Sequence, residues 1–195
     1  MSGVEWILLL AQMPSGPSSI RVTLWRRMKA AGAVSLHNGV WALPASAKNE
    51  LFMNEIFTYV REHSGSASIF SARALTPDVE QRIIDEFSKN IAEDYVEFID
   101  KCKDFLIEID GEIRQKKFTF AELDENEAEL QKLTSWLRKI RARDNLGNAR
   151  AQEAGDIMES CRQILRAFAR SVYANEGIDV QESEIEYRDE KPVEG

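Results

Sequence analysis

Four side chains around the first predicted helix have the types that bind an oxyanion. Ser18 and Ser19 open this helix, where unpaired backbone N–H groups carry partial positive charge, and Arg21 follows within the first turn. Arg73 ends a later predicted strand and would lie on the same rim. Because an arginine fork binds oxyanions through two parallel hydrogen bonds, these residues predict an anion or phosphate site.

A purely structural role would account for the same residues. The serines would then cap the helix, and Arg21 would pair with a carboxylate such as Glu50 or Glu55. The sequence leaves both interpretations open.

Three further cations, Arg26, Arg27 and Lys29, lie on the same predicted helix. At about 100° per residue, the apolar residues between Ile20 and Gly32 form one stripe, and Arg26 and Lys29 fall on the far side. The three cations predict contacts with DNA phosphates, which would make binding depend strongly on salt. A solvated helix face explains them as well.

Net charge is divided unevenly along the chain. The whole sequence carries -8, yet residues 1–75 contain seven Lys or Arg against four Glu. A basic first part followed by an acidic remainder places any contact with nucleic acid or an oxyanion in the first part. Two solvated surfaces of different sign are the alternative.

The remaining chemistry-bearing residues indicate no reaction. Cys102 and Cys161 fall on apolar helical stripes, so we predict core residues rather than a disulfide or a metal site. The first apolar run is too short to cross a bilayer, and no export signal is visible. We therefore expect a cytoplasmic protein without enzymatic activity, cofactor, metal or membrane contact.

The elements that position these residues begin with a strand over Trp6–Ala11, a helix over 20–32 and a hairpin around Asn38-Gly39, the pair that favours a type I′ turn. A helix over 45–63 and a strand over 67–72 follow. This order predicts an α+β fold with a ferredoxin-like βαββαβ domain over residues 1–75, in which the strands holding Trp6 and Trp41 are central. A winged helix would need two helices before the basic one.

From Thr76 the apolar period changes to that of helices. We predict an antiparallel bundle of long helices over 76–175 and an acidic, disordered tail over 176–195. The first of these helices is either one very long helix or two helices in line, with a break at Gly111.

Two segments carry a resemblance to a known family. R-V-x-L-W-R-R-M-K-A-x-G-A, followed by a hairpin that ends G-V-W-A-L-P, resembles the amino-terminal domain of the chromate resistance protein ChrB family and the ferredoxin-like domain of PaaX-type repressors. The resemblance implies a chromate-responsive, DNA-binding transcription regulator and a homodimer. ChrB proteins usually carry a further carboxy-terminal domain, for which 195 residues leave no room.

Two other functions stay open. The long helices would suit a scaffold protein that binds a partner without nucleic acid. The sheet is also similar to that of small CRISPR adaptation proteins, some of which bind a metal through an aspartate at the end of the first strand. Ala11-Gln12-Met13 holds no carboxylate there, so a metal-dependent nuclease is the least favoured function.

Overall fold

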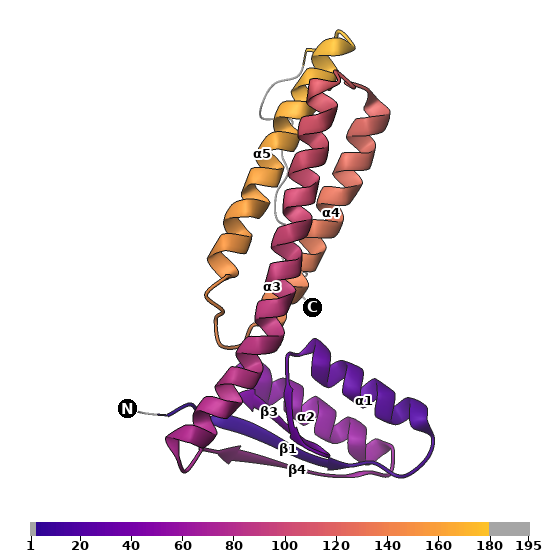
Figure 1. The fold of residues 1–195 in the computed structure, drawn as a ribbon. Coiled ribbons are helices and arrows are strands. Elements are labelled where there is room, and N and C mark those ends of the chain that lie inside the picture. The colour runs from indigo at the N-terminus through magenta and orange to yellow at the C-terminus, as the bar shows by residue number, and fades with distance from the viewer. Residues whose placement is uncertain (1–2, 180–195) are drawn as a thin grey trace. The chain divides into compact units, whose positions relative to one another are not determined.

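A computed structural model describes residues 3–179. Its nine elements alternate in the order β-α-ββ-α-β and then continue as three long helices (Figure 1). The strands are β1 (Trp6–Gln12), β2 (Val34–His37), β3 (Val40–Pro44) and β4 (Ser66–Ala72). The helices are α1 (Ser18–Ala30), α2 (Ala47–Glu62), α3 (Pro77–Arg114), α4 (Phe120–Arg143) and α5 (Ala151–Asn175).

The four strands form one antiparallel sheet in the order β2-β3-β1-β4, which confirms the predicted ferredoxin-like arrangement with β1 and β3 central. Both α1 and α2 cover the same face of the sheet (Figure 1). The opposite face is covered at one end, where Trp6 stacks on Phe87 of α3 with ring centroids 5.4 Å apart. β1 is central in the sheet and is buried on both faces at its start, at Trp6 and Ile7, whereas Leu10 near its other end is 39% exposed.

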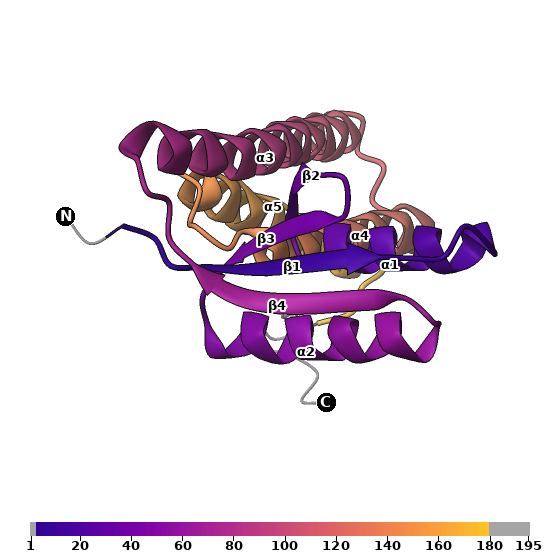
Figure 2. The same ribbon diagram turned by 90° about the horizontal axis from the view of Figure 1, so that it is seen from below.

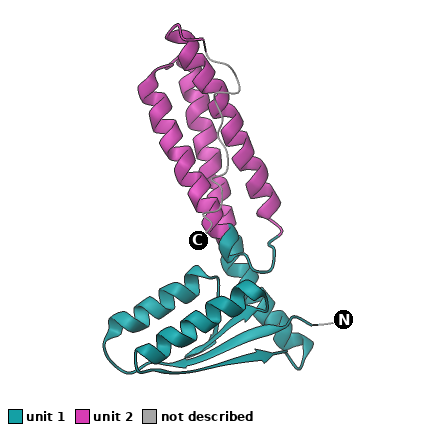
Figure 3. Cartoon of the chain, turned by 180° about the vertical axis from the view of Figure 1, so that it is seen from behind, with its two compact units in different colours: residues 1–92, 141–148 teal, residues 93–140, 149–195 magenta. Residues whose placement is uncertain are grey.

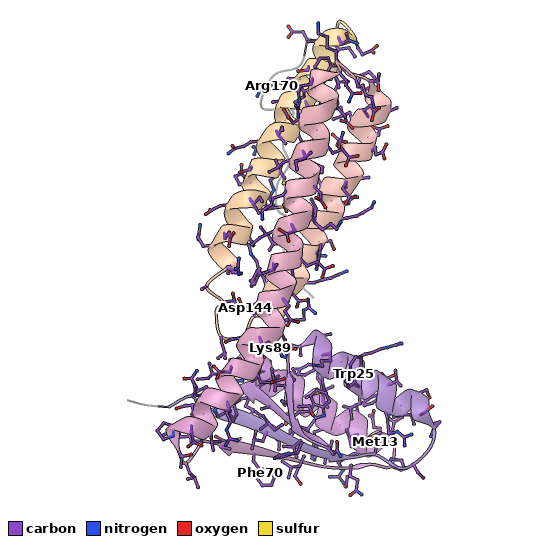
Figure 4. All side chains as sticks on the ribbon, in the orientation of Figure 1. Met13, Trp25, Phe70, Lys89, Asp144 and Arg170 are labelled. Carbon is purple, nitrogen blue, oxygen red and sulfur yellow. The ribbon has the colours of Figure 1, made fainter. Side chains whose placement is uncertain are left out.

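Viewed from below, the strands of this sheet lie side by side (Figure 2). Phe70 projects from the sheet on the side away from α1 and α2 (Figure 4) and is about half exposed. Its cross-strand partner on β1 is Leu8. This part of the sheet therefore presents apolar surface within the described chain.

The predicted hairpin is present, but its predicted turn type is wrong. Among the described residues of the turn only Gly39 has a positive φ, of 76°, whereas a type I′ turn requires positive φ at Asn38 as well. The pairing of β2 with β3 shifts register between Ser35 and His37. Such a β-bulge or irregularity next to a turn is typical of hairpins that lack the type I′ conformation.

The start of α1 also differs from the prediction. Pro17 occupies the N-cap position, with extended backbone and no side-chain hydrogen bond to the helix, and Ser18 is already the first helical residue. The serines therefore do not cap α1, because Pro17 takes that position. The predicted stop at Gly32 is confirmed, since its φ of 75° is the left-handed conformation that glycine adopts readily.

The three long helices pack together as predicted. α3 runs through Gly111 to Arg114, so of the two alternatives the single very long helix is present and the break at Gly111 is not; an isolated glycine costs a helix only about 1 kcal/mol. The chain reverses beyond it, where Lys116 has a φ of 55°. The apolar stripe of α5 that contains Cys161 is fully buried, at Met158, Cys161, Leu165, Phe168 and Val172.

The chain forms two compact units (Figure 3). Unit 1 comprises residues 1–92 and 141–148, and unit 2 comprises 93–140 and 149–195. The first unit extends past the predicted boundary at residue 75 because the first turns of α3 pack on the sheet through Phe87. Of the tail predicted to be disordered, residues 180–195 lie outside the described part of the chain.

Candidate functional site

Arg21 lies at the surface and folds back on the loop before α1. Its Nη1 donates to the carbonyl oxygens of Pro14 and Ser15, at 3.0 and 2.7 Å. Neither Glu50 nor Glu55 is its partner in these bonds. The guanidinium still has donors at Nε and Nη2, so an oxyanion site formed by Arg21 with Ser18 and Ser19 stays a prediction.

Arg73 does not share a rim with that loop. In the register of β4 against β1, Ser66 pairs with Gln12 next to the loop, whereas Ala72 pairs with Trp6 at the opposite end. Seven residues of strand separate the two ends by about 20 Å. Arg73 instead lies 3.7 Å from Glu5, so the predicted convergence of Arg73 with Arg21 is wrong.

The three cations of α1 divide into two kinds. Arg27 contacts α2, where its guanidinium lies 3.4 Å from the Glu55 carboxylate and 5.3 Å from the centroid of the Tyr59 ring. The side chains of Arg26 and Lys29 make no hydrogen bond or ion pair within residues 3–179. Two of the three cations therefore keep their charge uncommitted on a surface that also exposes Trp25 (Figure 4).

A segment distant in sequence completes this end of unit 1. Residues 141–148, which end α4 and lead toward α5, belong to unit 1. The Asn145 side chain donates to the Ala31 carbonyl at 2.9 Å and accepts from Asn49 at 3.1 Å. It thereby joins the end of α1 to the start of α2. Asn49 is 4% exposed and also donates to the Pro44 carbonyl at 2.8 Å, so the junction is buried and satisfied.

Gly32 is required at this junction. With φ at 75°, a Cβ on this residue would lie 2.3 Å from the Arg143 carbonyl oxygen. The contact of residues 141–148 with the end of α1 could not be predicted from the sequence, because turn residues do not indicate which distant helix end they contact. No signal in the sequence marked Asn49 on α2 as the buried partner of Asn145.

A hollow of about 590 Å³ lies at the end of β1. It is lined by residues 10–13, 38–40 and 66–68, and no carboxylate, histidine or cysteine is among them. Within residues 3–179 no three His, Cys, Asp or Glu side chains gather as metal ligands would. The residues that line this hollow therefore include no side chain of the kinds that bind the metal ion of a metal-dependent nuclease.

Unit 2 buries two polar pairs. The Asn126 amide donates to the Glu112 carboxylate at 2.7 Å, and burial raises the pKa of Glu112 above its ordinary value. Cys102 and Cys161 are fully buried, and the Cys161 thiol lies 3.6 Å from the Cys102 carbonyl oxygen. Their mutual hydrogen bond raises the pKa of Cys102 and lowers that of Cys161. As predicted, both cysteines belong to the core.

No helix within residues 3–179 is long and apolar enough to span a membrane.

The family model described as "Protein ChrB, N-terminal" matches residues 21–178, which begin within α1 and include β2 to β4, α2 and all three long helices. No curated protein and no solved structure matches the chain.

Proposed function

This chain belongs to the ChrB amino-terminal family, which is linked to chromate resistance, and on that premise we propose that it is a non-catalytic regulator that binds DNA through unit 1. The observation that carries the proposal is the pair of uncommitted cations, Arg26 and Lys29, on the surface of α1. Duplex DNA attracts such cations because each phosphate contact releases condensed counterions.

The proposal selects two of the three predicted DNA contacts. Arg27 already has the Glu55 carboxylate and the Tyr59 ring as partners, so its transfer to a phosphate would break existing contacts. Arg26 and Lys29 would lose only water. We therefore assign Arg26 and Lys29 to DNA and Arg27 to the packing of α1 on α2.

Fluorescence anisotropy with labelled duplex from the region upstream of its own gene tests this assignment. Release of about 0.9 counterion per phosphate contact makes each contact worth about eightfold in affinity at 0.1 M salt. We expect about that loss in Arg26→Ala and in Lys29→Ala, and a much smaller one in Arg27→Ala.

Arg27→Ala is the matched control, because it removes the same charge from the same helix. Equal losses in all three variants would show a nonspecific charge effect and contradict the assignment. Absence of binding by the wild type at low salt would reject DNA binding and favour a scaffold role for the long helices. Homodimer formation, which the family resemblance also implies, remains a prediction that sedimentation equilibrium checks.

A further inference from the structure

We propose that the DNA-contacting surface of unit 1 extends beyond α1 to Lys48 and Arg141, so that one surface is assembled from three separate parts of the chain. This inference rests on the DNA-binding role proposed above and adds two binding residues to it. We call the set formed by Arg26, Lys29, Lys48 and Arg141 the four-cation surface.

The contacts of residues 141–148 bring the three parts together. A single side chain, that of Asn145, hydrogen-bonds both to the carbonyl of Ala31 at the end of α1 and to the amide of Asn49 at the start of α2. Lys29 lies two residues before Ala31, and Lys48 immediately precedes Asn49. The two lysines are therefore held at the same end of unit 1.

Arg141 is tied to this end by a second contact. The Lys48 ammonium donates to the Ala142 carbonyl at 3.1 Å, which fixes the last turn of α4 next to the start of α2. An ammonium has three donors, so Lys48 keeps two of them for another acceptor. Arg141 is exposed, and its side chain makes no hydrogen bond or ion pair within residues 3–179.

Charge in the three stretches is strongly one-sided. Residues 26–32, 46–50 and 141–148 together contain six Lys or Arg and two acids, Glu50 and Asp144, and one of the six cations, Arg27, pairs with Glu55 outside these ranges. The Asp144 carboxylate accepts from the backbone N–H groups of Gly147 and Asn148 and so stabilises the turn itself (Figure 4). Cations gathered with so little neutralisation repel one another, and a bound polyanion relieves that repulsion.

A phosphodiester backbone is the polyanion that this surface fits. The four cations come from α1, the start of α2 and the end of α4, and three of them are exposed while Lys29 is half-buried, so we infer an extended surface of donors and not an enclosed cavity for one small anion. Contacts of this kind position a protein on a duplex without reading its sequence. The four-cation surface would thus contribute affinity and salt dependence, with sequence preference left to other side chains.

The test measures the affinity of the full chain for a labelled duplex at several salt concentrations. We expect Lys48→Ala and Arg141→Ala each to weaken binding several-fold at about 0.1 M salt and to reduce the slope of log affinity against log salt by about 0.9. Because both substitutions leave the apolar cores intact, thermal unfolding should confirm that the variants remain folded.

Two controls remove the same charge elsewhere. Lys132→Ala removes an exposed cation of unit 2 that pairs with Glu129, and Arg73→Ala removes one at the opposite end of the sheet of unit 1. Both should retain the wild-type slope. If Arg26→Ala and Lys29→Ala reduce the slope while Lys48→Ala and Arg141→Ala match these controls, the extended surface is wrong and binding is confined to α1. If the wild type itself does not bind the duplex, the DNA-binding role proposed above is wrong, and the extended surface is rejected with it.

Discussion

Replacing Gly32 by alanine should separate residues 141–148 from unit 1. The new Cβ would lie 2.3 Å from the Arg143 carbonyl oxygen and 2.8 Å from Asn145 Nδ2, both far inside van der Waals contact. Backbone at this site leaves little room to yield, so the segment must move and the bonds of Asn145 to Ala31, Asn49 and Arg143 must weaken or break.

The expected loss in the free energy of unfolding of unit 1 has two parts, one from the backbone conformation of residue 32 and one from the hydrogen bonds of Asn145. A left-handed conformation costs an L-residue about 1–2 kcal/mol, and the lower entropy of the unfolded alanine chain returns about 0.4–1 kcal/mol. Each of the three Asn145 hydrogen bonds contributes about 1 kcal/mol net. The free energy of unfolding of unit 1 should therefore fall by about 3–4 kcal/mol in Gly32→Ala.

Gly147→Ala is the matched control, because Gly147 has a φ of 77° but no atom within 4 Å of an added Cβ. It should lose only about 1 kcal/mol from its backbone conformation. Urea unfolding in a Trp136→Phe background isolates the signal, since the remaining tryptophans, Trp6, Trp25 and Trp41, lie in unit 1. Equal losses in the two alanine variants would refute the docking of residues 141–148.

Three further outcomes follow. Burial raises the pKa of Glu112, so the folded state binds a proton on this carboxylate more tightly than the unfolded state does, and stability falls as pH rises through the folded-state pKa. Glu112→Gln should therefore exceed the wild type in Tm at pH 7, and this difference in Tm should close as pH falls below about 4.3. A difference in Tm that does not depend on pH would be the contrary result. Cys102 and Cys161 should not react with Ellman's reagent until the chain unfolds, and rapid labelling of the folded protein would place them outside the core. By calorimetry, chromate affinity should fall about tenfold in Arg21→Ala but not in Arg73→Ala, whereas equal affinities in all three proteins would exclude the loop before α1 as an anion site.

Much of the fold follows from local patterns. The apolar run of β1, the Asn-Gly turn and the change of apolar period at Thr76 each depend on neighbouring residues, and the structure places a strand, a hairpin and a long helix there. Errors arose where a neighbour decided the outcome. Pro17, and neither serine, occupies the N-cap of α1. The hairpin lacks the type I′ turn and has a register shift between Ser35 and His37.

The candidate site was less accessible to prediction because it depends on contacts between distant residues. Spacing along α1 identified Arg26 and Lys29 as outward-facing, but it could not show that Arg27 contacts Glu55. The prediction that Arg73 lies near Arg21 assumed that the two residues share one end of the sheet. The register of β4 against β1 places them at opposite ends. Nothing within residues 141–148 indicated that they belong to the first unit.

The salt dependence of DNA binding by the wild-type chain tests the central claim most directly. Four phosphate contacts at about 0.9 counterion each predict a slope of log affinity against log salt between about -3 and -4. Such a slope, reduced stepwise by alanine at Arg26, Lys29, Lys48 and Arg141, is the result that the account predicts. A slope near zero, or no binding at low salt, would contradict it.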